Sequence, residues 1–171
     1  MSTRIVVRSP DLFDVSALAR VHVETWRETY RGLMRDEVLD DPGFIERRER
    51  FWTAVLTDDR FHGGIAVAEQ DDEMVGIALA GPSSGDDTMW TTQLYVLYTY
   101  SAVHGSGAGS ALLAAVLDAR GSSVLWVADP NPRAQAFYRK HDFVPDGTSK
   151  IEDGVRELRM IRSSGASGAA R

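Results

Sequence analysis

Apolar and polar positions follow two periods along this chain, and the period separates predicted strands from predicted helices. Runs rich in β-branched and aromatic residues predict strands at 4–8, 63–70, 73–81, 90–99, 122–128 and 153–162. Apolar residues at spacings of three and four predict helices from Asp14 or Ser16 to near Gly32, at 44–56, from the glycines of 105–109 to about Arg120, and at 131–141. This order predicts a mixed α/β sheet with at least one crossover helix.

The length of 171 residues suits one hydrophobic core, and no repeat or interdomain linker interrupts the pattern. We therefore expect one domain over residues 1–162 and a flexible tail over residues 163–171, "SSGASGAAR", which has little to bury. No run approaches the roughly 20 apolar residues that a bilayer span requires. The first residues, "MSTRIVVRSPD", lack a signal-peptide core, so the expected location is cytoplasmic.

Composition and charge narrow the chemistry. The chain has no cysteine, which excludes disulfides, thiolate metal sites and a cysteine nucleophile. No metal site is expected either, because the histidines are scattered, at His22, His62, His104 and His141. The net charge is −6 and no block of Lys and Arg stands out, so we expect no nucleic-acid partner. The overall field of an acidic protein favours a cationic partner instead.

A glycine-rich segment precedes the third predicted helix, in the stretch "AVHGSGAGSALLAAVL" at 102–117. Glycine accepts positive φ and lets a ligand approach the backbone, and a helix start presents unpaired N–H groups to an anion. The segment is therefore a candidate phosphate cradle; the alternative is a tight strand-to-helix connection with no ligand. It lacks the Gly-Lys-Ser/Thr of a Walker loop, and its G-x-G-x-G spacing differs from the G-x-G-x-x-G of a Rossmann site.

Two segments resemble the GNAT acetyltransferase superfamily. "LYTYSAVHGSGAGSALL" is similar to its acetyl-CoA signature, in which Gln or Arg is followed by x-x-G-x and then Gly or Ala; His104 stands at the Gln or Arg position. "LWVADPNPRAQAFYRKHDFVPDG" resembles the family's strand, N-x-x-A-x-x-F-Y and G-F pattern, which places Asn131, Ala134, Phe137 and Tyr138 on it. "HVETWRETYRGLM" is similar to the first helix of many bacterial members, so the resemblance covers residues 4–162.

The resemblance implies a mixed, mostly antiparallel central sheet with a splayed parallel strand pair, flanked by about four helices. It implies that the co-substrate acetyl-CoA lays its pyrophosphate on backbone N–H groups of residues 104–109 and pairs its pantetheine arm with the strand near Leu97 and Thr99. A backbone N–H at Leu97 or Tyr98 would stabilise the oxyanion. The implied cofactor-binding set is Leu97, Tyr98, Thr99, His104, Gly105, Ser106, Gly107, Ala108, Gly109, Ser110 and Asn131.

Acetylation of an amine requires a proton donor for the leaving thiolate and removal of a proton from the ammonium, whose reference pKa is ~10.4. Tyr138 falls on the family's tyrosine position and is the candidate acid; the alternative is a half-buried packing residue. The base is less clear, because Gln93 stands where many relatives carry Glu and an amide cannot accept the proton. Glu24 and Glu28 are candidates through water or are solvated helix charges, and Asp129 is a further candidate or the N-cap before "NPRA".

By the same resemblance, the first helix lines the acceptor pocket, although core packing is the competing interpretation for Trp26. The residues assigned to acceptor binding are Glu24, Trp26, Arg27, Glu28, Tyr30 and Gln93. Two departures weaken the phosphate contact: His104, which is mostly neutral at pH 7, and Ser106, where a basic residue is common. "HDF" also replaces the usual "LGF", which puts Asp142 at an expected positive-φ position.

The leading hypothesis is an N-acetyltransferase for the primary amine of a small molecule. A cationic acceptor such as a polyamine, an amino sugar or an aminoglycoside-type antibiotic suits the acidic charge, and the last of these would make antibiotic resistance the role. The alternatives are a protein N-terminal or lysine acetyltransferase, which needs an open groove for a peptide, and a CoA-binding module without catalysis, which Gln93 keeps open. Many relatives pair C-terminal strands, so the resemblance also implies a homodimer.

Overall fold

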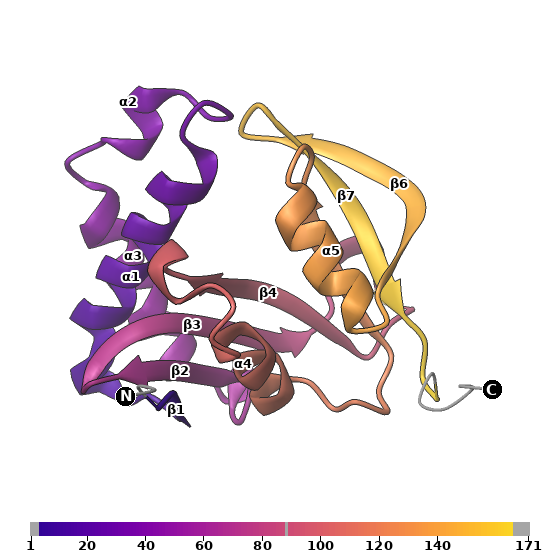
Figure 1. The fold of residues 1–171 in the computed structure, drawn as a ribbon, viewed down its shortest axis with the longest axis horizontal. Helices are drawn as coiled ribbons and strands as arrows, with labels where there is room; N and C mark the ends of the chain where they lie inside the picture. Colours follow the sequence, from indigo (N-terminus) through magenta and orange to yellow (C-terminus); the bar gives the residue numbers. More distant parts are fainter. Residues whose placement is uncertain (1–3, 88, 166–171) are drawn as a thin grey trace.

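A seven-stranded sheet forms the centre of the protein, with the strand order β1-β2-β3-β4-β5-β7-β6 (Figure 1). A computed structural model describes residues 4–87 and 89–165. The strands are β1 (Val6–Arg8), β2 (Ile65–Gln70), β3 (Glu73–Pro82), β4 (Thr92–Thr99), β5 (Ser123–Ala128), β6 (Val144–Glu152) and β7 (Val155–Arg162). Every neighbouring pair is antiparallel except β4 and β5, which run parallel. The predicted mixed, mostly antiparallel sheet is confirmed.

Helices cover both faces of this sheet. They are α1 (Val15–Tyr30), α2 (Asp36–Leu39), α3 (Phe44–Leu56), α4 (Ala108–Val116) and α5 (Pro132–Lys140). Val67 of β2 packs with α1 and α3, whereas its neighbours Ala66 and Ala68 pack with α4. Because successive residues of a strand point to opposite faces, α1 and α3 cover one face and α4 covers the other. Tyr138 and Leu113 share one apolar cluster, which places α5 on the α4 face.

Two helix ends follow local signals in the sequence. The helix predicted at 44–56 is α3 with the same bounds. Helix α1 ends at Tyr30, and Gly32 follows with φ +86°, as expected of a glycine just past a helix C-terminus. Asp142 likewise takes the expected positive φ, +68°.

The helix predicted to reach about Arg120 is shorter than expected and ends at Val116. Leu117 leaves the helix in an extended conformation and stays buried in the cluster beneath α5. A turn follows at once, in which Asp118 accepts hydrogen bonds from the amides of Arg120 (2.9 Å) and Gly121 (3.1 Å). The prediction was wrong here because the polar turn and the buried leucine outweigh the helical propensity of the preceding run.

The predictions missed α2 and β6. Strand β6 reads "VPDGTSKIE", is exposed along nearly its whole length and pairs with β7 at the edge of the sheet. An exposed edge strand has no apolar alternation to reveal it. At its far end, the tip of the β6–β7 hairpin meets the α1–α2 region, because Val155 packs with Tyr30, Met34 and Leu39 (Figure 1).

The face under α1 and α3 holds a dense aromatic core. Trp52 and His22 are 0% and 2% exposed, and the indole N–H of Trp52 donates to Nδ1 of His22 at 3.2 Å. Burial lowers the pKa of His22 to about 3, and the positive charge of Arg48 adds to this effect. No helix in the described part of the chain is long and apolar enough to cross a membrane.

Candidate active site

The parallel strands β4 and β5 separate after a short paired stretch. Their pairing joins Thr92–Leu94 to Ser123–Leu125 and covers three residue pairs. Directly after this stretch, the pairing of β3 with β4 shifts between Leu79 and Ala80, so that Tyr95 is an extra residue in β4. A bulge bends its strand and increases the local twist, so β4 turns away from β5 at this point. The predicted splayed pair is confirmed.

The splay leaves main-chain groups of β4 free on one edge. The amide N–H of Tyr100 donates a hydrogen bond to Val75 O at 3.0 Å. This bond sets the register, and therefore determines which residues of β4 hydrogen-bond to β3. Because this bonding alternates along an antiparallel pair, the amides and carbonyls of Leu97 and Thr99 face the open edge. The amide of Tyr98 faces β3 instead, so Leu97 is the better placed of the two oxyanion donors suggested by the sequence.

A cavity of about 690 Å³ occupies the splay. Its walls include residues of β5 from both faces of the sheet: Leu125 and Val127 belong to the cluster under α5, whereas Ala128 packs with Tyr30 of α1. The cavity therefore passes through the sheet, from the α4–α5 face to the α1 face. Residues from β4, β5, α1, α5 and the glycine segment line it together.

The glycines of the segment serve two different purposes. Gly105 and Gly107 take φ values of +81° and +89°, which other residues adopt only under strain, and Gly107 is the N-cap of α4. Gly109 is helical, and a Cβ there would lie 3.3 Å from the ring of Phe137. The first two glycines thus shape the turn, and the third lets α4 approach α5.

The turn leaves a defined set of amides unpaired. His104 and Ser106 donate their amides to Ser101 O and Val103 O, both at 3.1 Å, and Ala108 donates to Ser106 Oγ at 3.2 Å. These three amides are already bonded, which corrects the expectation that all of residues 104–109 are free donors. Among residues 104–110, all of which the structure describes, the amides without a hydrogen-bond partner are those of Gly105, Gly107, Gly109 and Ser110.

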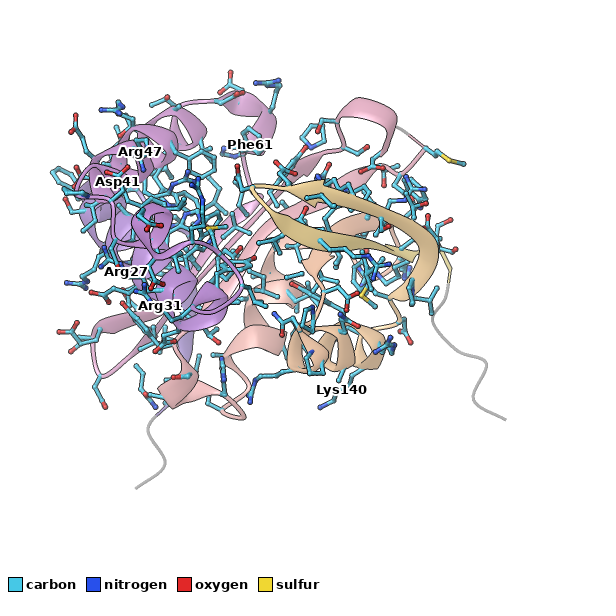
Figure 2. The ribbon with its side chains drawn as sticks, turned by 90° about the horizontal axis from the view of Figure 1, so that it is seen from above. Arg27, Arg31, Asp41, Arg47, Phe61 and Lys140 are labelled. Carbon is cyan, nitrogen blue, oxygen red and sulfur yellow. The ribbon has the colours of Figure 1, made fainter. Side chains whose placement is uncertain are left out.

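Polar and cationic side chains surround this turn. The Oγ of Ser110 lies 3.0 Å from Nε2 of His141, and both Arg133 and Lys140 line the cavity. Lys140 extends outward from α5 at the surface (Figure 2). Burial and the nearby charge of Arg133 lower the pKa of His104, so its imidazole is neutral at pH 7. Arg133 and Lys140 were not predicted from the sequence, because only the fold brings α5 beside the glycine turn.

Tyr138 lines the cavity from α5. Its side chain is 9% exposed and packs edge-on against the rings of Phe137 and Phe143, with centroids 5.4 and 5.9 Å away. No other part of the described chain hydrogen-bonds its hydroxyl, which leaves that group available to a ligand. Burial raises the pKa of Tyr138, and the neighbouring Tyr30 adds to the effect, so the phenol remains protonated at neutral pH.

Asn131 is the N-cap of α5, where its Oδ1 accepts from the amide of Ala134 at 3.1 Å, and it also lines the cavity. The alternative that Asp129 caps this helix was therefore wrong. Asp129 instead accepts from Arg156 at 2.6 Å and from Gln135 at 3.3 Å.

Only part of the expected acceptor set reaches the cavity. Glu28 and Tyr30 line it. The carboxylate of Glu28 accepts from the amide (2.9 Å) and the hydroxyl (3.1 Å) of Ser101, and the Tyr30 hydroxyl lies 3.4 Å from that of Tyr98.

The other expected acceptor residues lie elsewhere among the described residues. Glu24 accepts from the Tyr100 hydroxyl, and Arg27 donates to Leu39 O at 2.9 Å on the α1–α2 side of the molecule (Figure 2). Gln93 lies before the bulge and accepts from Ser84 N at 3.4 Å. Trp26 packs against Tyr30 and Phe44, with ring centroids 5.1 and 5.5 Å away, so the core-packing interpretation holds for it. No group of three or more potential metal ligands gathers in the described chain.

Comparison with known proteins places this geometry in a family. Residues 18–143 match the model of the acetyltransferase (GNAT) family. An uncharacterized N-acetyltransferase of Bacillus subtilis, YuaI, is 28% identical over 143 residues, covering 80% of this chain and 79% of that protein.

Solved structures share the fold. The crystal structure of PH1933 from Pyrococcus horikoshii superposes with a TM-score of 0.71 at 20% identity, covering 94% of this chain and 99% of that one. The PaiA N-acetyltransferase of Thermoplasma acidophilum, solved in complex with coenzyme A, gives a TM-score of 0.69 at 18% identity, covering 91% and 98%. The chain therefore belongs to the GNAT acetyltransferase family, and it is an acyltransferase that uses acetyl-CoA.

Proposed function

We propose that this protein transfers the acetyl group of acetyl-CoA to the primary amine of a small cationic molecule, and that residues 1–162 form the catalytic domain. The observation that carries the proposal is the cavity through the sheet, which has Tyr138 on its wall and the unpaired amides of the glycine turn at one end. An acyl donor with a long arm and an anionic head fits such a cavity.

Each part of the donor has complementary groups on this chain. The amides of Gly105, Gly107, Gly109 and Ser110 suit a pyrophosphate at the start of α4, and Arg133 and Lys140 supply the positive charge that Ser106 and the neutral His104 lack. The free edge of β4 at Leu97 and Thr99 suits the amides of the pantetheine arm, which pairs as an added strand would. In the described part of the chain no group accepts from the side-chain N–H groups of Asn131, so they suit the same arm.

The reaction divides between main chain and side chain. The amide of Leu97 faces the open edge and stabilises the negative charge that develops on the carbonyl oxygen. Tyr138 donates its proton to the sulfur as the C–S bond breaks, because its buried phenol is held protonated. The phenolate then recovers a proton from the new amide nitrogen, which returns the site to its starting state.

A cationic acceptor is favoured by charge. The protein has a net charge of −6, and Glu28 lines the cavity. A field of this sign attracts amines in their ammonium form and repels carboxylates. Polyamines, amino sugars and aminoglycoside-type antibiotics are therefore the acceptor classes to test.

The test is release of CoA thiol from acetyl-CoA with two panels at pH 7: spermidine, 1,4-diaminobutane, glucosamine and kanamycin, and peptides that carry a free N-terminus or lysine. Turnover with small amines and none with peptides is the expected result. Turnover with peptides alone would assign a protein substrate, and acetyl-CoA binding without thiol release from either panel would contradict the proposal.

A further inference from the structure

On the α1 face of the sheet, a carboxylate of β7 lies next to β5, a strand that lines the cavity, and the proposed reaction does not yet use it. An acceptor amine must reach the thioester from the side opposite the pantetheine arm and must lose a proton there. Tyr138 reaches the splay from the α5 face. A base for the acceptor amine is therefore expected on the other face.

Strand β7 places Glu157 on that face. Leu158 and Met160 pack in the cluster under α5, so Glu157, which alternates with them, points to the opposite side. Val155, two residues away on the same side, packs against Tyr30 of α1. Glu157 also pairs in register with Ala128 of β5, and Ala128 forms part of the cavity wall. The carboxylate thus lies beside the α1 opening of the cavity.

Electrostatic contact supports this placement. Burial raises the pKa of the Tyr30 phenol, and the negative charge of Glu157 raises it further. The pKa of Glu157 is itself raised, first by burial and then by Glu152 and Asp153, although Lys150 opposes the shift. A carboxylate with a raised pKa is a better proton acceptor than an ordinary one.

Glu157 has few competing contacts. Among residues 4–87 and 89–165, its charged partner is Lys150, with Nζ at 3.5 Å, and its side chain is 22% exposed. The other carboxylates near the cavity are already bonded: Glu24 to Tyr100, Glu28 to Ser101, Asp129 to Arg156 and Gln135, and Asp87 to Trp126 and Arg159. Among the described residues, Glu157 differs from these carboxylates in having no closer polar partner than its 3.5 Å ion pair with Lys150.

We propose that Glu157 is the catalytic base, which receives the ammonium of the acceptor at the α1 opening and takes its proton. This assignment rests on the proposed function and extends it to the acceptor half of the reaction. The ammonium N–H bond breaks and the proton moves to a carboxylate oxygen. The freed lone pair forms the C–N bond, the C–S bond breaks, and sulfur takes the Tyr138 proton. The Tyr138 phenolate then takes the remaining extra proton from the new amide nitrogen. Glu157 then releases its proton to water, so the net products are the amide, CoA thiol and one proton.

The test compares E157Q with the wild type, using the best amine of the small-molecule panel. At about pH 7 we expect kcat/KM for the amine to fall by about 10²-fold or more, while KM for acetyl-CoA is unchanged. The loss should shrink as the pH rises toward about 10, because the free amine then forms without a base. Other groups facing Glu157 that titrate or carry charge are Tyr30, Lys150, Glu152, Asp153 and Arg159.

A matched control is E152Q. Glu152 also pairs with Lys150, at 2.6 Å, but its side chain is 60% exposed on the edge strand. We expect E152Q to keep most of the wild-type kcat/KM at pH 7, because the base is still present; loss of the Glu152 charge lowers the pKa of Glu157 and shifts the pH profile without removing it. An E157Q loss of equal size at every pH, or no loss at all, would overturn the role of Glu157 while leaving the proposed function in place. Wild-type protein that releases no thiol with any amine of the panel would overturn both.

Discussion

The hydroxyl of Tyr30 on α1 lies 3.4 Å from the hydroxyl of Tyr98 on β4, and this contact joins the first helix to the strand that borders the open splay. Burial raises the pKa of both phenols, so both remain protonated and one donates to the other. Both residues line the cavity. The pair therefore holds the α1 end of the cavity against the central sheet.

Removing one hydroxyl of this pair should lower the free energy of unfolding more than removing both does. Y30F leaves the buried Tyr98 hydroxyl without its partner, which costs about 1–3 kcal/mol of unfolding free energy. The double variant Y30F/Y98F removes both polar groups with little change of shape, so its stability should return toward that of the wild type. Urea unfolding of the four proteins measures the coupling. Additive losses would mean that the two hydroxyls do not interact.

Y138F tests the proposed acid separately from the fold of the site. The phenol packs between Phe137 and Phe143, and Phe preserves these ring contacts. We expect kcat to fall by about 10²-fold or more, with acetyl-CoA affinity unchanged by calorimetry. A kcat close to that of the wild type would return Tyr138 to a packing role. The matched control is F137Y, which adds a hydroxyl to the neighbouring ring.

Local signals predicted much of the fold and part of the site. The spacing in "FIERRERFWTAVL" gave both ends of α3, and the glycine pattern located the turn before α4. Gln93 and Trp26, which the resemblance assigned to acceptor binding, do not line the cavity. The bulge at Tyr95 opens the splay only after Gln93, and the indole of Trp26 packs in the core. No sequence period reveals a bulge that depends on pairing between two strands.

Long-range pairing also explains what the sequence could not reveal. In the sequence, Glu157 is one of several charged residues in the last predicted strand, where polar and apolar residues alternate. Its position beside Ala128, which lines the cavity, follows from β7 lying between β5 and β6. The positions of Arg133 and Lys140 at the cavity could not be predicted for the same reason, because α5 lies against the glycine turn only in the folded protein.

His104 should make acetyl-CoA binding depend on pH. Burial and Arg133 lower the pKa of its imidazole in the free protein, and an adjacent phosphate would raise that pKa by favouring the charged form. Binding then takes up a proton, so KM for acetyl-CoA should rise as the pH increases from 6 to 8. H104Q should flatten this dependence. A KM that is already flat in the wild type would mean that His104 does not contact the phosphates.

His22 should make the folded protein less stable in mild acid. Its pKa is about 3 in the folded state, against 6.5 for an unperturbed histidine, because it is buried among aromatic rings. Between these two values the unfolded chain binds a proton that the folded protein does not, so stability falls as the pH decreases. The slope approaches about 1.4 kcal/mol per pH unit once the unfolded histidine is fully charged. Urea unfolding between pH 7 and pH 5, above the range of most carboxylates, measures it. H22Q offers Trp52 a carbonyl acceptor that does not titrate, so its stability should vary less over this range; an identical slope in both proteins would assign the acid sensitivity to another group.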